Sequence, residues 1–174
     1  HNETFSMAND FGKALQILAG KAGIYGMIGG HVVDVKNVGN PVSKEVLDFI
    51  YELKTSALIE SSMMIGAVLA GASNEDVQKM ERIAKGVGIA FQIQDDYLDL
   101  ASDEETLGKP IGSDIGKGKM TIIAIKGLDS VDDDRLLEIL KAENNSQDEI
   151  DEAIEILTNC GAIEYARNLA LESV

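Results

Sequence analysis

Three aspartates lie among apolar residues in the segment IAFQIQDDYLDLA, which covers residues 89 to 101. A carboxylate among apolar neighbours loses hydration, and this costs free energy unless a cation or hydrogen bonds replace the water. On a helix, residues three and four apart share a face, so Asp95 or Asp96 would align with Asp99. Gln92 would lie on the same face. The spacing therefore predicts a cluster of carboxylate oxygens on one side of a helix.

A divalent cation would convert the repulsion between such carboxylates into a binding force. Two carboxylates about 4 Å apart repel by about 4 kcal/mol at an effective dielectric of about 20. Magnesium uses one or two carboxylates together with water and substrate phosphates. The calcium loop of an EF-hand is excluded, because DDYLDLASDEE lacks its alternating ligands and its sixth-position glycine. Asp95, Asp96 and Asp99 therefore predict a magnesium site, with a solvated helix face as the alternative.

Residues suited to a phosphate occur in two other segments. Lys54 and Thr55, in ELKTSAL, place a cation and a hydroxyl inside an otherwise apolar helix. The alternative for this pair is a lysine that extends to solvent and a threonine that packs between helices. Further along, Lys109, Lys117 and Lys119 lie among glycines that would let the backbone approach a ligand closely.

The segment 103–119 lacks helical periodicity and is rich in glycine and charge. We predict a loop there, and long loops in compact domains are often functional. Its sequence GSDIGKGKMT superficially resembles a phosphate-binding P-loop. However, five residues separate Gly112 from Gly118, and Met120 stands where that motif needs serine or threonine. No strand clearly precedes the segment, so we exclude the P-loop.

Apolar residues at three- and four-residue steps predict helices along most of the chain. The two prolines, Pro41 and Pro110, each fall in a plausible connection. Ser73 or Asn74 would cap the helix that carries the aspartates. The predicted helices cover 10–28, extending to 35, then 43–71 and 74–102, and finally 120–128, 132–142, 146–159 and 161–172. No alternating run indicates a sheet, so the predicted fold class is all-α.

Composition indicates a single packed unit and excludes several classes of partner. The 174 residues are 45% hydrophobic and 26% charged, the balance of an ordinary globular protein. The net charge of -15 would repel a nucleic-acid backbone, although divalent ions and local lysines still allow a small phosphorylated ligand.

Cysteine usage and hydropathy bear on location. The lone Cys160 cannot form an internal disulfide, which favours a reducing compartment. The most apolar stretch, residues 62–72, is too short to span a bilayer, and no signal peptide precedes it. We therefore expect a cytoplasmic protein without stable membrane insertion.

Three motifs in order, LKTSALI, FQIQDDYLDL and TLGKPIGSDIGKGKMT, resemble the C-terminal half of trans-isoprenyl diphosphate synthases, the farnesyl and geranylgeranyl diphosphate synthase family. The resemblance runs over residues 20–167. Asp95, Asp96 and Asp99 match the family's second DDxxD motif, which holds Mg2+. The resemblance implies an isoprenoid synthase-type helical bundle with a central cavity. Residues 1–174 would then form one partial polyprenyl synthetase domain that lacks the N-terminal helices and the extreme C-terminus.

The resemblance also implies a reaction and a role for each matching residue. The reaction is condensation of isopentenyl diphosphate with an allylic diphosphate, releasing pyrophosphate. Lys54 would bind the allylic diphosphate, and Thr55 would help to accept the proton lost at the end. Gln92, Lys109 and Lys119 would contact the diphosphate. The family's usual assembly implies a homodimer.

Some features depart from the family pattern and leave alternatives open. The family's first aspartate-rich motif is absent, so we expect weak or no activity from this chain alone. His31 replaces a glutamine of the family, and residues 120–123 also differ. A non-catalytic prenyl synthase-like subunit or a helical interaction module is the main alternative. A terpene cyclase is less favoured, because it would carry an asparagine-serine-glutamate type motif in place of DDxxD.

Overall fold

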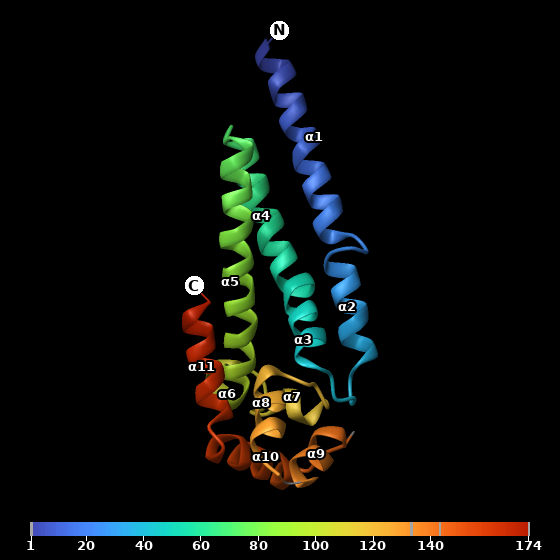
Figure 1. The fold of residues 1–174 in the computed structure, drawn as a ribbon, viewed down its shortest axis with the longest axis vertical. Helices are drawn as coiled ribbons and strands as arrows, with labels where there is room; N and C mark the ends of the chain where they lie inside the picture. Colours follow the sequence, from blue (N-terminus) through green and yellow to red (C-terminus); the bar gives the residue numbers. More distant parts are fainter. Residues whose placement is uncertain (1, 133, 143, 174) are drawn as a thin grey trace. The chain divides into compact units, whose positions relative to one another are not determined.

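The computed structural model describes residues 2–132, 134–142 and 144–173 (Figure 1). Within these ranges the chain is helical and contains no strand, which confirms the all-α prediction. The chain forms two compact units. The first combines the chain up to Val33 with Phe49–Ile89, and the second combines Asp34–Asp48 with Ala90–Ser173. No helix in the described ranges is both long and apolar enough to cross a membrane.

The first unit is built around the helices α1 (Asn2–Ala22), α4 (Ala57–Leu69) and the first part of α5 (Asn74–Ala101). Helix α1 packs against α4. A small apolar core joins α4 to the start of α5 and consists of Met64, Val68 and Val77, with Ile17, Ala67 and Ala72 packed against it.

The first predicted helix is divided in two, so the prediction of one helix running to residue 35 is wrong. Helix α1 ends at Ala22, and α2 covers Met27–Lys36. The turn is closed by the amide of Gly26, which donates to the carbonyl of Gly23 at 3.0 Å. A β-carbon on Gly26 would lie 2.0 Å from the carbonyl oxygen of Lys21, so the turn needs glycine here.

The second predicted helix, 43–71, contains a π-helical segment. Helix α3 (Lys44–Ile50) leads into the π-helix η1 (Tyr51–Ser56), which continues into α4. The hydroxyl of Ser56 donates to the carbonyl of Tyr51 at 3.1 Å, five residues earlier, which matches the wider π-helical turn. Short π-helical segments frequently occur at functional sites.

The third predicted helix is confirmed closely, because α5 runs from Asn74 to Ala101. Ser73 caps it: the Ser73 hydroxyl accepts from the amide of Asp76 at 3.2 Å and donates to the Asp76 carboxylate at 2.7 Å. The hydrogen bond from Ser73 lowers the pKa of Asp76. A capping serine typically contributes about 1 kcal/mol to helix stability.

In the described part of the second unit, six helices follow α5. The predicted loop includes two single-turn helices, α6 (Glu104–Leu107) and α7 (Ser113–Gly116). The four predicted short helices are confirmed as α8 (Ile122–Ser130), α9 (Asp134–Lys141), α10 (Gln147–Asn159) and α11 (Ala162–Glu172). Their core is formed by fully buried apolar side chains: Ile123, Leu136, Ile139, Leu140, Ala153, Leu157, Ala162 and Ala166.

Candidate functional site

The three aspartates of α5 lie in the second unit and differ in exposure. Asp96 and Asp99 are 1% and 0% exposed, whereas Asp95 is exposed to solvent. Adjacent residues on a helix point in different directions, so the three carboxylates do not all face the same way. Two of the three predicted ligands therefore point into the protein, and each of these needs a counter-charge.

Lys119 supplies the counter-charge for Asp96. Its ammonium lies 3.0 Å from Oδ1 of Asp96 and 2.9 Å from Oδ2 of Asp114. The side-chain amide of Gln92 also donates to Oδ1 of Asp96, at 3.3 Å. Burial alone would lower the pKa of Lys119, but the negative charges of Asp96 and Asp114 outweigh it and raise the pKa well above the usual lysine value. Lys119 is therefore held as a cation at neutral pH.

Lys109 supplies the counter-charge for Asp99. Its ammonium lies 2.8 Å from Oδ1 of Asp99. We treat this contact as an ion pair, because Oδ1 has no hydrogen bond of normal geometry although the distance would allow one. The contact with Asp99 raises the pKa of Lys109, and the nearby charges of Asp114 and Asp95 add to the effect.

Backbone amides of the loop complete the environment of Asp99. We use the term lysine loop for residues 108–119, which carry Lys109 and Lys119. The amide of Asp114 donates to Oδ2 of Asp99 at 2.9 Å, and the amide of Gly112 donates to the Asp99 carbonyl at 2.8 Å. The lysine loop is thus attached to the last turns of α5 by side-chain and backbone contacts.

Asp114 is a site residue that the sequence analysis missed. It is 8% exposed and binds Lys119 through Oδ2. Its flanking glycines were visible in GSDIGKG, but its partner was not, because Lys119 must turn back toward it. Gly118 makes this turn with a φ of +64°, and its carbonyl accepts from the amide of Gly39 at 2.9 Å. The segment around Gly39 therefore holds the end of the lysine loop.

These six side chains form an aspartate–lysine cluster: Asp95, Asp96, Asp99, Asp114, Lys109 and Lys119. The cluster contains four carboxylates and two ammonium groups, so two negative charges are left uncompensated. Carboxylate oxygens are the ligands that a hard divalent cation prefers, and the excess negative charge would attract such a cation. No group of three or more Asp, Glu, His or Cys side chains in the described ranges is already arranged to hold a metal ion. Metal binding by Asp95, Asp96 and Asp99 stays a prediction.

Lys54 and Thr55 lie in the first unit, inside the π-helix η1, and are half-buried. The backbone of η1 is closely approached by two glycines. A β-carbon on Gly30 of α2 would lie 2.6 Å from the amide nitrogen of Lys54, and one on Gly88 of α5 would lie 2.5 Å from Cα of Ser56. The π-helix is therefore held by backbone contact. That Lys54 and Thr55 share a site with the aspartates stays a prediction.

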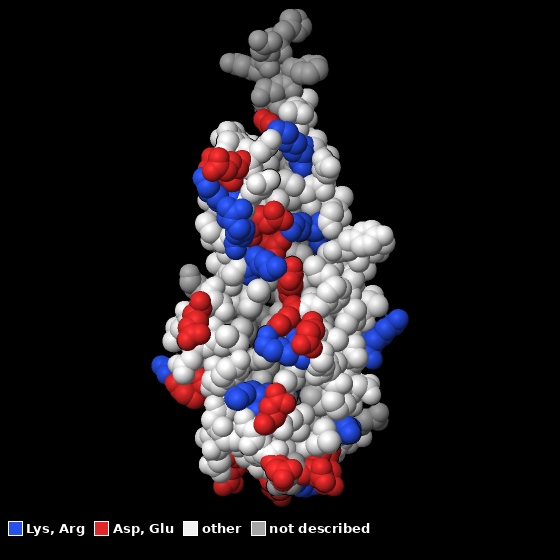
Figure 2. Space-filling view, in the orientation of Figure 1, with Lys and Arg blue, Asp and Glu red and all other residues white. Residues whose placement is uncertain are grey.

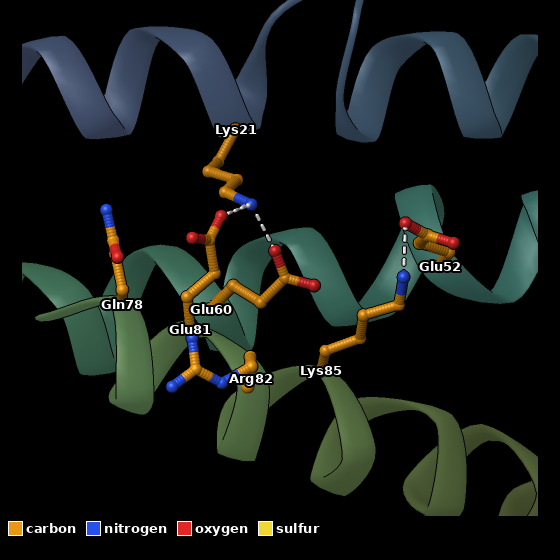
Figure 3. Close-up of a pocket in the computed structure, with 7 residues that line it drawn as sticks. All are labelled: Lys21, Glu52, Glu60, Gln78, Glu81, Arg82 and Lys85. Carbon is orange, nitrogen blue, oxygen red and sulfur yellow. Dashed lines mark hydrogen bonds and ion pairs between the residues drawn. The ribbon is translucent and has the colours of Figure 1, made fainter. Parts of the chain in front are cut away.

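The first unit also contains a charged pocket of about 340 Å³ that the sequence did not indicate (Figure 3). Lys21 pairs there with Glu60 and, at 2.7 Å, with Glu81, while Lys85 pairs with Glu52 at 2.6 Å. Arg82 and Gln78 complete the lining. Acidic and basic groups balance in this pocket, so it offers no net charge to a diphosphate or to a metal. Figure 2 shows acidic and basic side chains interspersed in the same way over one face of the molecule.

Known proteins with similar sequences are prenyl diphosphate synthases. The polyprenyl synthetase family model matches residues 3–157. The short chain isoprenyl diphosphate synthase of Methanocaldococcus jannaschii is 51% identical over 130 residues, covering 73% of this chain and 39% of the relative. The geranylgeranyl diphosphate synthase of Sulfolobus acidocaldarius is 44% identical over 130 residues, with the same coverage of 73% and 39%. A heterodimeric geranylgeranyl pyrophosphate synthase large subunit of Arabidopsis thaliana is 37% identical over 120 residues, covering 67% of this chain and 32% of that protein.

Solved structures of prenyl synthases resemble the fold of this chain. Geranylgeranyl pyrophosphate synthetase from Pyrococcus horikoshii matches with a TM-score of 0.81 and 32% identity, covering 95% of this chain and 50% of that one. A polyprenyl synthase from Caulobacter crescentus, complexed with calcium and isoprenyl diphosphate, matches with a TM-score of 0.86 and 26% identity over 92% of this chain and 50% of that one. The chain spans only 32% to 39% of the length of the curated relatives above. By sequence and by fold, this chain belongs to the polyprenyl synthetase family.

Proposed function

We propose that the chain forms part of a magnesium-dependent trans-prenyltransferase. The reaction joins isopentenyl diphosphate to an allylic diphosphate and releases pyrophosphate. The observation that carries the proposal is the aspartate–lysine cluster, in which buried Asp96 and Asp99 hold Lys119 and Lys109. The names of the relatives, isoprenyl and geranylgeranyl diphosphate synthases, support the same chemistry.

In the proposed reaction the bond between the allylic carbon and the diphosphate oxygen breaks, and pyrophosphate leaves with the electron pair. The double bond of isopentenyl diphosphate then attacks the allylic cation, and a proton is lost. Lys109 and Lys119 would donate to the oxygens on which negative charge grows. Lys54 would hold the same diphosphate, and Thr55 would help to accept the proton. Gln92, which contacts Asp96 at 3.3 Å, would help to orient the site.

We propose that Mg2+ is the cofactor and that the carboxylates of Asp95, Asp96 and Asp99 supply its negative surroundings. When bound, Mg2+ would neutralise charge on the diphosphate and stabilise the departing pyrophosphate. Asp95 is the ligand we favour most, because it is exposed, whereas Asp96 and Asp99 are buried against lysines. Magnesium commonly takes only one or two carboxylates and completes its shell with water and substrate phosphates.

The proposal extends to the parent assembly. We propose that the chain supplies one part of a single polyprenyl synthetase domain and that the first aspartate-rich motif comes from additional N-terminal helices. A cytoplasmic homodimer is the assembly that we propose. Exposed apolar side chains on α1 support a partner surface there: Phe11, Leu15 and Leu18 are 54%, 66% and 45% exposed.

A second candidate is a non-catalytic subunit that binds a catalytic partner. It is favoured by one observation: the Arabidopsis relative is named as the large subunit of a heterodimeric synthase.

A chimera separates the two candidates. In it, this chain replaces the region of the M. jannaschii enzyme that it matches, and pyrophosphate release is measured with isopentenyl diphosphate, an allylic diphosphate and Mg2+. We expect turnover by the chimera and little or none by this chain alone. Asp95→Asn should abolish most of the chimera's turnover, whereas Asp132→Asn, a change of an exposed aspartate, should not. A folded chimera without turnover would support the non-catalytic subunit.

A further inference from the structure

We infer that Asp99 is a positioning residue for the lysine loop and does not itself bind the metal. This inference rests on the proposed function, because it divides that function among the three aspartates of α5. Asp99 would fix the loop, Asp96 would hold Lys119, and Asp95 would face the metal.

The contacts of Asp99 carry the inference. Oδ1 lies 2.8 Å from the ammonium of Lys109, and Oδ2 accepts from the amide of Asp114 at 2.9 Å. The carbonyl of Asp99 accepts from the amide of Gly112 at 2.8 Å. Three points of the lysine loop therefore end on one residue of α5, and that residue is 0% exposed.

These contacts leave Asp99 little capacity for a metal. Oδ1 faces the Lys109 ammonium, Oδ2 accepts from the Asp114 amide, and the residue is buried, so a metal could reach either oxygen only if the lysine loop moved away from Asp99. Such a movement would leave the buried amide of Asp114 without its acceptor, which costs free energy. Asp95 lies about one helical turn before Asp99 on α5 and is exposed, so its oxygens can reach a metal from solvent.

The position of Lys119 follows from the same anchor. Asp99 holds the Asp114 amide, and the Asp114 carboxylate then meets the Lys119 ammonium at 2.9 Å. The amide of Lys119 donates back to the Asp114 carbonyl, also at 2.9 Å. Loss of Asp99 should therefore disturb both lysines that the proposed function assigns to the diphosphate, although Asp99 touches only Lys109.

The test uses the full 174-residue chain and four variants: Asp99→Ala, Asp99→Asn, Asp95→Asn and the exposed control Asp132→Asn. Amide hydrogen exchange is followed at Gly112 and Asp114. Binding of Mn2+ is followed by electron paramagnetic resonance, and binding of inorganic pyrophosphate to the Mn2+-loaded chain by calorimetry. Asparagine keeps one oxygen that can accept the Asp114 amide, so Asp99→Asn is the conservative variant that keeps the test informative if Asp99→Ala unfolds.

We expect Asp99→Ala to speed exchange at Asp114 by about ten- to a hundredfold, the factor that corresponds to losing a hydrogen bond to a charged acceptor. Asp99→Asn should restore much of this protection. Neither should weaken Mn2+ binding by more than about twofold, but Asp99→Ala should weaken pyrophosphate binding by about tenfold or more, and Asp99→Asn by less. Asp95→Asn should weaken Mn2+ binding and leave exchange unchanged, and Asp132→Asn should change neither.

Two results would overturn the inference. One is an Asp99→Asn variant that loses Mn2+ as strongly as Asp95→Asn while its loop exchange is unchanged, since that would make Asp99 a direct ligand. The other is unchanged exchange at Gly112 and Asp114 in a folded Asp99→Ala variant. If the unaltered chain fails to bind Mn2+, the metal part of the proposed function fails, and the exchange measurements still decide the role of Asp99.

Discussion

Removal of the Lys119 charge should destabilise the protein strongly, because it would remove the ammonium that lies against the buried Asp96 carboxylate. Asp96 is 1% exposed, and its Oδ1 lies 3.0 Å from the Lys119 ammonium. Breaking a buried ion pair by removing one partner typically costs about 3–5 kcal/mol. The Lys119 side chain is 23% exposed, and the amide of Gln92 would still donate to Asp96 in the variant. We therefore expect Lys119→Met to lower the free energy of unfolding by about 3 kcal/mol, the lower end of this range.

The assay is urea unfolding at neutral pH, with a matched control on the surface. Lys44 pairs with Asp48 at 2.7 Å, but both side chains are 54% exposed. Lys44→Met should therefore change the free energy of unfolding by no more than about 0.5 kcal/mol. The double variant Asp96→Asn with Lys119→Met removes both charges and should recover a large part of the loss. If Lys119→Met and Lys44→Met are equally mild, the buried pair does not exist as described.

Two further predictions concern pH and backbone packing. The folded pKa of Lys119 is raised above its usual value of 10.5, so its stabilising contribution is fully present below pH 10.5 and lost as pH rises above it. The difference in unfolding free energy between the unaltered chain and Lys119→Met should therefore be constant up to that pH and shrink beyond it, as urea titrations at several pH values would reveal. Gly30→Ala should destabilise by about 1–3 kcal/mol through overpacking against η1, partly offset by a gain in helix propensity. Gly66→Ala should stabilise the protein by about 1 kcal/mol, because a β-carbon there would meet nothing within 4 Å. Thermal unfolding of both variants tests the packing: it is wrong as described if the two substitutions shift the unfolding temperature in the same direction.

Features set by local sequence were predicted well. Helix α5 begins after Ser73 because the Ser73 hydroxyl accepts from the amide of Asp76, only three residues later. The apolar periodicity that follows is unbroken to Ala101. The division at Gly23 and Gly26 was missed because apolar residues continue at helical spacing across it. Periodicity records which side chains face one way, and it does not record a backbone turn that two glycines permit.

Features set by distant contacts could not be predicted in the same way. The π-helix η1 lies against Gly30 and Gly88, which are far from it in sequence. The partners of the aspartates were also hidden: Lys119 is 23 residues from Asp96, and the Asp114 amide is 15 residues from the Asp99 carboxylate that accepts it. The resemblance supplied the residue types of the site, whereas their pairing depends on the path of the lysine loop.

The most direct measurement is calorimetric titration of the full chain with inorganic pyrophosphate, with Mg2+ present and after its removal by EDTA. The account predicts binding that depends on Mg2+, is weakened about tenfold or more by Asp95→Asn, and is unchanged by Asp132→Asn. Pyrophosphate binding of equal strength with and without Mg2+, or equal binding by the unaltered chain and Asp95→Asn, would contradict it.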